Sequence, residues 1–369
     1  MTHITLSQIM LDNLTTAFIL KDHYPCNMPE LGSQTSRRKV LSALGVSSVA
    51  LAGCMSGEDG SGSQDGEGDD SGSQNSIPDT ATFAGGGSGG AWSLGAATWS
   101  EFAREEFDVS VTSRDGGGEA NIVDVVNGDV DIAWTFSNTL HKGYNGDGNF
   151  PEEFDQLRAI GAVWPAPAMT VAVPDVNSYS DLEGRTIAPG KSGFSGYAAA
   201  LMILDYYDVS EDDVDIVAAG YSEMTSLYQD GQVDSLHLMG SIPHSVPQQG
   251  LSRSDGKMLP MSDDVISEIT SQEDGWANIE IPAGTFPNAS NGDQAVPTAG
   301  TYTVIFTRES MSEEVVYTLT KKNFEEKDRM VNAHSVYDQM TAENATKGIS
   351  GLPFHPGAKR ALNELGIDI

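Results

Sequence analysis

Residues 80–135 read TATFAGGGSGGAWSLGAATWSEFAREEFDVSVTSRDGGGEANIVDVVNGDVDIAWT, and short apolar runs alternate in them with helical patterns. The same alternation continues to residue 173. The segments expected as strands are 80–84, 109–112, 132–135, 157–163 and 169–173, and those expected as helices are 92–106 and 120–127. Strands that alternate with helices in this way predict an α/β fold.

A second α/β unit begins at the turn Asp181-Leu182-Glu183-Gly184-Arg185. The pattern after this turn predicts strands at 186–188, 214–217, 236–239 and 301–307, and helices at 196–207, 222–229, 313–327 and 328–339. We expect the chain to cross to a second lobe near residue 174 and to return near residue 296. The predicted lobes are therefore 79–173 with 296–369, and 174–295.

The chain is strongly acidic, with 53 Asp and Glu residues, 20 Lys and Arg residues and a formal net charge of −33. This charge argues against binding to nucleic acid or to anionic lipid through charge. The acidic residues are spread along the whole chain, as in proteins of salt-loving microbes, and the alternative is an ordinary acidic protein. In molar salt the Debye length falls to about 3 Å, which would screen the self-repulsion of such a surface.

An export signal is expected near the N-terminus. Arg37 and Arg38 precede an apolar run at 40–53 that is too short to span a bilayer, and they match a twin-arginine signal. Leu51-Ala52-Gly53-Cys54 resembles a lipobox, so Cys54 is expected to be lipidated and to become the mature N-terminus, anchored at the outer face of the cytoplasmic membrane. Met28 is a candidate for the true start, and 55–78 reads as a disordered Gly/Ser/Asp tether.

The segment Gly85–Gly90 formally satisfies G-x-G-x-x-G between a strand and a helix, which is the pattern of a dinucleotide site. The acidic residue expected at the end of the second strand is missing, because Asp108 precedes that strand. The simpler interpretation is a glycine-rich turn that presents backbone N–H groups and a helix N-terminus to an anion such as a carboxylate. This interpretation requires no cofactor, and none is expected.

Enzyme and metal motifs are incomplete. Residues 184–192 have five residues between the glycines where a phosphate-binding loop requires four, and 193–197 lacks the final glycine of a nucleophile elbow. The histidines, which include His237, His244 and His355, show no metal-ligand spacing, and scattered carboxylates are the remaining alternative for a metal site. Because no catalytic constellation is visible, we expect a protein that is not an enzyme.

Several loops end strands and begin helices, and in an open α/β sheet ligands bind at the carboxyl ends of the strands. We expect such loops from both lobes to form a ligand cleft. The candidate ligand-binding residues are Gly89, Gly90, Trp92, Ser93, Gly117, Gly118, Asn121, Ser137, Asn138, Trp164, Lys191, Ser192, Gly193, Phe194, Ser195 and Gly240. The alternative for Trp92, Trp134 and Trp164 is core packing, and the alternative for Lys191 is a solvated loop lysine.

In this order, the loops resemble those of the TAXI family, the solute-binding subunits of one class of TRAP (tripartite ATP-independent periplasmic) transporters. The resemblance covers roughly residues 80–366. Its most specific pieces are Ile281-Pro282-Ala283-Gly284-Thr285 and His355-Pro356-Gly357-Ala358. The resemblance also includes 89–95, 115–121, 127–138, 157–165, 181–185 and 189–196.

The resemblance implies two α/β lobes with a type II periplasmic-binding fold that close on a small organic acid or amino acid, typically glutamate-like or a dicarboxylate. It also implies delivery of that solute to membrane subunits driven by an ion gradient. A binding subunit of an ABC importer would have the same fold and anchor, and a tethered extracellular enzyme is the alternative from another class.

The chain departs from the TAXI pattern at three places. The aromatic pair after Gly-Gly is replaced by Ala91-Trp92-Ser93, a Gln-Ser-Asp triplet by Phe136-Ser137-Asn138, and the glycine loop carries Lys191 and Phe194. The change from Asp to Asn removes a charge that could pair with an amino group, and Lys191 could add a cation for a carboxylate. These changes favour an anionic ligand that is less like an amino acid.

Overall fold

The computed structural model describes residues 79–369 apart from 193–194. The export signal at Arg37 and Arg38, the lipobox with Cys54 and the expected tether at 55–78 therefore lie outside the described residues. None of the helices in the described part of the chain is both long and apolar enough to cross a membrane.

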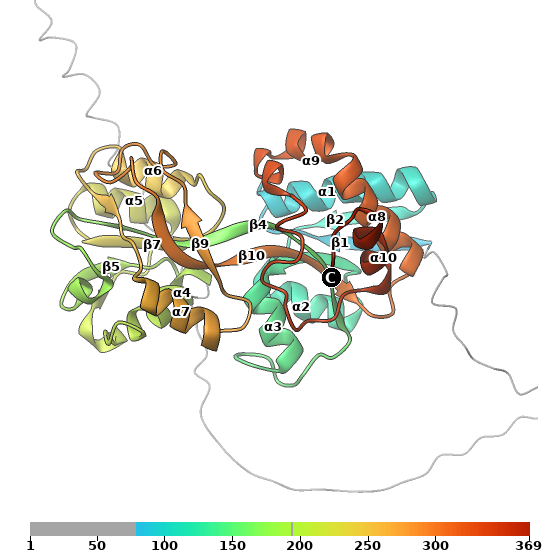
Figure 1. Cartoon of the computed structure of the whole chain (residues 1–369), viewed down its shortest axis with the longest axis horizontal. Helices are drawn as coiled ribbons and strands as arrows, with labels where there is room; N and C mark the ends of the chain where they lie inside the picture. The colour runs from blue at the N-terminus through green and yellow to red at the C-terminus, as the bar shows by residue number, and fades with distance from the viewer. Residues whose placement is uncertain (1–78, 193–194) are drawn as a thin grey trace, which may run out of the picture. The chain divides into compact units, whose positions relative to one another are not determined.

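The described part of the chain begins with strands and helices in alternation and ends with helices, as Figure 1 shows. The first elements are β1 (Thr80–Ala84), α1 (Ala91–Phe107), β2 (Ser110–Arg114), α2 (Gly118–Asn127), β3 (Ile132–Phe136), α3 (Ser137–Asn145) and the long strand β4 (Leu157–Ala172). The last are β10 (Val296–Arg308), α8 (Glu313–Glu325), α9 (Lys327–Ala333), the 3₁₀ turn η3 (Ser335–Gln339) and α10 (Pro356–Glu364).

The middle of the chain forms smaller elements between β4 and β10. They are η1 (Tyr179–Leu182), β5 (Thr186–Ala188), α4 (Ser195–Asp205), η2 (Glu211–Asp213), β6 (Asp215–Ile216), α5 (Tyr221–Gln229), β7 (Ser235–Met239), α6 (Ser245–Leu251), β8 (Lys257–Met258), α7 (Asp263–Gln272) and β9 (Ala277–Ile281).

The sheet has the strand order β2-β1-β3-β10-β4-β7-β5-β6. In one half, β2, β1 and β3 are parallel and β10 is antiparallel to β3; in the other half, β6, β5 and β7 are parallel and β4 is antiparallel to β7. Each half thus repeats one arrangement, and its fourth strand crosses from the other half. This is the predicted two-lobe, type II α/β fold.

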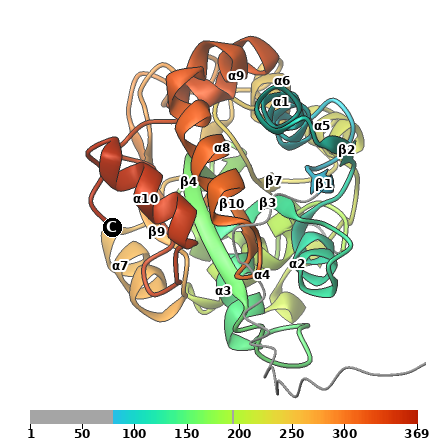
Figure 2. The same ribbon diagram turned by 90° about the vertical axis from the view of Figure 1, so that its right-hand side faces the viewer.

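The hydrophobic cores follow this division. β4 residues from Leu157 to Trp164 pack in the clusters of the first half, whereas those from Ala168 to Ala172 pack in the clusters of the second half. In the first half, α1, α8 and α9 contribute to one cluster, and α2 and α3 contribute to another on the opposite side of the sheet (Figure 2). The two strands β4 and β10 therefore serve both lobes.

Most predicted elements are present, with two kinds of difference. The apolar runs 157–163 and 169–173 belong to one strand, because Pro165 and Pro167 continue the ladder opposite Tyr302 and Gly300 instead of ending it. The predicted helix 328–339 is divided into α9 and η3 at His334. The second kind of difference is elements that were not predicted, which include α3, α6, α7, α10, β8 and β9.

Candidate functional site

In lobe 1, the loop after β1 is held tightly against the start of α1. A Cβ atom at Gly85 would lie 2.5 Å from the backbone nitrogen of Ser93, so only glycine permits this approach. Gly89 has a φ of +76°, and Gly90 is the N-cap of α1 without a side-chain hydrogen bond. Because no side chain caps it, the first turn of α1 has backbone N–H groups to offer to a ligand.

Trp92 lies in this first turn and is half-buried. Its indole N–H donates to Thr303 Oγ1 over 3.1 Å, and its ring meets that of Phe136 edge to face at 4.8 Å between centroids. Since the indole N–H is already satisfied, Trp92 offers an apolar surface to a ligand. Phe136 and Thr303 were not recognised from the sequence as members of the site, because they meet Trp92 only in the folded sheet.

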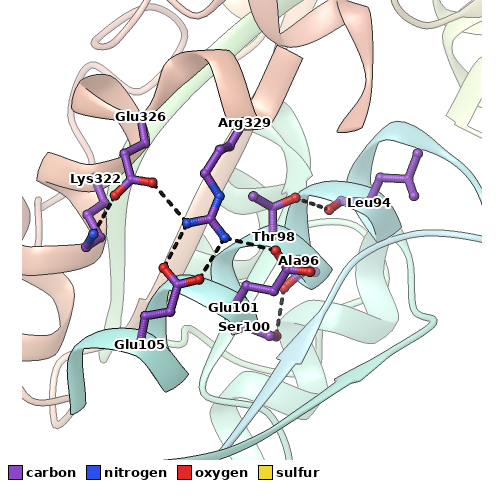
Figure 3. Close-up of polar contacts among 9 residues, drawn as sticks. All are labelled: Leu94, Ala96, Thr98, Ser100, Glu101, Glu105, Lys322, Glu326 and Arg329. Carbon is purple, nitrogen blue, oxygen red and sulfur yellow. Dashed lines mark hydrogen bonds and ion pairs between the residues drawn. The ribbon is translucent and has the colours of Figure 1, made fainter. Parts of the chain in front are cut away.

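Ion pairs connect α1 to α8, through Lys322 and Glu106, and to α9, through Arg329. Arg329 contacts Glu101, Glu105 and Glu326 (Figure 3). Its guanidinium also lies 4.7 Å from the centroid of the Phe102 ring. The hydrogen bond from Arg329 lowers the pKa of the Glu105 carboxyl. These contacts give α1 a fixed position behind the loop 85–90.

Asn121 is fully buried and joins three loops. Its amide donates to the carbonyls of Gly85 (2.8 Å) and Trp134 (2.7 Å), and its side-chain oxygen accepts from the Gly117 N–H (3.0 Å). Gly117 and Gly118 have positive φ values of +152° and +48°. Both donors of Asn121 are used inside the protein, so Asn121 positions the loops instead of presenting an amide to solvent.

Ser137 and Asn138 begin α3 beneath a loop of the other half of the chain. Ser137 Oγ donates to Gly275 O over 2.6 Å and accepts from the Tyr302 N–H. A Cβ atom at Gly275 would lie 2.5 Å from the nitrogen of Asn138. Ser137 is thus committed to protein contacts, whereas Asn138 keeps a buried side-chain oxygen without a hydrogen-bond partner among the described residues.

Trp164 and Trp134 belong to the core of lobe 1. Trp164 is 2% exposed and packs edge to face on Tyr337, and Trp134 is fully buried against Trp99. For these two residues the core-packing alternative describes the structure. Trp164, predicted as a ligand contact within the stretch 157–165 of the family resemblance, instead packs in the core of lobe 1.

In lobe 2, three loops meet at the carboxyl ends of β5, β6 and β7. Lys191 and Ser192 are exposed, and the Lys191 side chain packs on Gly220, with 3.4 Å between Lys191 Cε and a Cβ placed there. A Cβ at Gly240 would lie 3.2 Å from the His244 ring. Gly193 and Phe194 lie outside the described residues, and Ser195 begins α4.

Tyr221 and His244 lie at the candidate site and were not singled out in the sequence analysis. Tyr221 is the first residue of α5, 40% exposed, and its ring meets that of His244 at 5.6 Å between centroids. His244 Nδ1 accepts from the Val246 N–H, which caps α6. Burial lowers the pKa of His244. The ring therefore favours the neutral form. The sequence analysis considered His244 only as a metal ligand, because its ring partner Tyr221 comes from another loop.

The described residues hold no group of three or more His, Cys, Asp and Glu side chains arranged for a metal ion. Of the cations near the loops of lobe 1, Arg114 is paired with Asp124. Lys191 is the cation at the loops of lobe 2, and it has no ion pair within the described ranges 79–192 and 195–369. The site is thus built from uncapped helix starts, aromatic rings and one lysine.

The fold is that of two-lobe periplasmic binding proteins, with loops from both lobes at the carboxyl ends of parallel strands. The chain belongs to the NMT1-like family, whose sequence profile matches residues 83–366.

Similar solved structures include the periplasmic aliphatic sulphonate binding protein SsuA from Escherichia coli, with 11% identity, a TM-score of 0.43, and coverage of 73% of this chain and 86% of that one. The periplasmic sulfonate-binding protein SsuA from Methylobacillus flagellatus KT has 13% identity, a TM-score of 0.46, and coverage of 79% and 97%. The methionine binding protein MetQ has 14% identity, a TM-score of 0.39, and coverage of 74% and 99%.

Proposed function

We propose that this protein is an exported, lipid-anchored solute-binding protein that captures a small organic anion or amino acid and delivers it to a TRAP-type secondary transporter. The observation that supports it best is the presence, in each of two lobes, of loops at the carboxyl ends of three parallel strands. Such loops are where ligands of open α/β sheets bind. The strands β4 and β10 connect the lobes, and we propose assigning both of them to lobe 1 (79–173 and 296–369), leaving 174–295 as lobe 2.

The proposed ligand contacts are the first turn of α1 with Gly89, Gly90, Trp92 and Ser93, and the lobe 2 loops with Lys191, Ser192 and Gly240. Gly117, Gly118 and Asn121 hold the first loops in place. Asn138 is a further proposed contact, because its buried side-chain oxygen has no hydrogen-bond partner among the described residues. No cofactor takes part, and the ligand leaves the site chemically unchanged.

The assignment to the TAXI class of TRAP subunits is supported by the order of the loop motifs between residues 80 and 366. It predicts that uptake of the ligand into membrane vesicles depends on an ion gradient. Uptake that is abolished by an ionophore and insensitive to ATP depletion would support a TRAP partner. Uptake that requires ATP would assign the protein to an ABC importer.

The anchor and the export route are part of the same proposal. Cys54 is the expected lipid attachment site and Arg37 and Arg38 are the expected export signal. Replacing Cys54 by Ala should release the protein from membranes into the soluble fraction, and replacing both arginines by Lys should retain the precursor inside the cell. A membrane-bound C54A protein would contradict the lipid anchor.

The binding function is tested by thermal unfolding of the full chain in molar KCl with amino acids, mono- and dicarboxylates and 2-oxo acids. A ligand at about 100 times its dissociation constant stabilises the folded state by about 2.7 kcal/mol. A selective and saturable rise of the midpoint, with the ligand recovered unchanged, is the expected result. Turnover of a ligand that binds would overturn the proposal in favour of the enzyme alternative.

A further inference from the structure

Lobe 2 is very poor in positive charge. Residues 174–295 contain 20 Asp and Glu but only 4 Lys and Arg. Arg185 is paired with Asp175 and Asp234, and Lys257 donates to Asn177. The remaining two are Arg253, beyond the C-terminal end of α6, and Lys191, at the loops where α5 and α6 begin. Among the described residues of 174–295, Lys191 is therefore the one cation that lies at the candidate ligand-binding loops.

Lys191 lies in an unusual electrostatic position. Its ammonium is 3.8 Å from a Cβ placed on Gly220, the N-cap of α5, which no side chain caps. A helix N-terminus carries a partial positive charge, so a lysine beside it is repelled. None of the carboxylates of the described residues forms an ion pair with Lys191, although the chain has 53 of them. An anion between Lys191 and the start of α5 would satisfy both positive groups.

The imidazole ring of His244, at the start of α6, does not add a second positive charge. His244 Nδ1 is an acceptor for the Val246 N–H, which requires an unprotonated Nδ1, and burial lowers the pKa of this imidazole. The side chains of His244 and Tyr221 instead form an edge-to-face pair next to Gly220 and Gly240. Lobe 2 thus offers one full positive charge beside an aromatic wall.

Lobe 1 offers an apolar surface. The loop residues 85–93, 115–121 and 136–138 contain no Lys or Arg, and Arg114 is neutralised by Asp124. Trp92 and Phe136 pack edge to face, and the indole N–H of Trp92 is bonded to Thr303. Aromatic rings whose polar atoms are satisfied favour apolar or aromatic groups of a ligand.

We propose, on the basis of the solute-binding function above, that the ligand is a monocarboxylate with an apolar or aromatic body. Its carboxylate binds Lys191 and the first turn of α5, and its body packs on Trp92 and Phe136. A dicarboxylate or glutamate would leave a second charged group without a cation on the loops of either lobe, which carries a desolvation cost.

The test measures dissociation constants by calorimetry with the full chain in molar KCl. The probes are phenylacetate and hexanoate, compared with glutarate and glutamate. The expected result is binding of phenylacetate or hexanoate at least about tenfold tighter than that of glutarate. Tighter binding of glutarate or glutamate would overturn the ligand class and leave the solute-binding function intact. Binding of none of the probes overturns this inference, whereas the wider panel above decides the binding function itself.

Two matched variants test whether Lys191 is the cation that binds the carboxylate of the ligand. Lys191→Gln should weaken binding of phenylacetate at least about tenfold, because it removes a charge-assisted hydrogen bond. Arg253→Gln removes an exposed cation of the same lobe and should leave binding unchanged. Unfolding midpoints without ligand show that both variants fold. Equal affinities of the two variants would overturn the role of Lys191.

The aromatic part is tested by Trp92→Leu. This variant should weaken binding of phenylacetate several-fold more than binding of acetate, because acetate has no body to pack on the indole. An equal loss for phenylacetate and acetate would show that Trp92 supports the fold and does not contact the ligand body.

Discussion

His237 is the most unusual residue of the core, being 4% exposed on the central strand β7. The Tyr179 hydroxyl donates to Thr170 Oγ1, which leaves the Thr170 hydroxyl hydrogen for His237 Nδ1 at 2.7 Å. His237 Nε2 therefore carries the proton, and it is buried without a hydrogen-bond partner among the described residues. Burial lowers the pKa of this imidazole to about 3.

This depressed pKa predicts a pH-dependent stability. Below the unfolded-state pKa of about 6.5, the unfolded chain binds a proton that the folded chain excludes, so the free energy of unfolding decreases as the pH falls from about 6.5 to 3. The slope from this residue is about 1.4 kcal/mol per pH unit. His237→Asn keeps an acceptor for Thr170 and should lack this slope. Urea unfolding of both proteins between these pH values is the measurement, and parallel curves would contradict the assignment.

At the scale of elements, β4 and β10 pack so closely at the junction of the lobes that a glycine is required. A Cβ at Gly300 would lie 2.6 Å from the Cα of Pro167 and 2.7 Å from the carbonyl oxygen of Ala166. Gly300→Ala should lower the free energy of unfolding by about 2 kcal/mol, because backbone must move. Gly161→Ala on β4 is the control, since its Cβ would meet Ala345 O at an ordinary 3.5 Å. Equal stability of the two variants in urea would refute this account.

The ion pairs of Arg329, on α9, join it to Glu101 and Glu105 of α1 and to Glu326 between α8 and α9, as Figure 3 shows. Arg329→Gln should lower the thermal midpoint by about 2 °C at low salt and by less in molar KCl, because salt screens exposed pairs. Arg253→Gln, which also removes one positive charge but has no ion pair within the described part of the chain, should not lower it. A loss that is independent of salt would attribute the role of Arg329 to packing on Phe102.

For the whole molecule, the net charge of −33 dominates the response to salt. Like charges on the surface repel one another in the compact state, and at about 1 M salt the Debye length is about 3 Å. The thermal midpoint of the full chain should therefore rise steadily from about 0.1 M to 2 M KCl. Sucrose at matched osmolality is the control for excluded-volume effects. A midpoint that falls or stays constant with KCl would argue against adaptation to high salt.

Local patterns by themselves determined the alternation of strands and helices, the two-lobe α/β class, and the glycine loops at 85–90 and 116–118. These features were predictable because period, turn residues and apolar runs act over a few residues. The same patterns singled out Trp92, at the start of the predicted helix 92–106, and Lys191, in the loop after the predicted strand 186–188.

Only the tertiary structure decided what each candidate side chain contacts. Asn121 and Ser137 are used inside the protein, Trp164 lies in the core, and Tyr221 and His244 join the site. Their partners lie in other loops, which the sheet brings together. The physical reason is that burial and hydrogen bonding depend on groups distant in sequence, and no local pattern records which loops meet once strands β4 and β10 have crossed between the lobes.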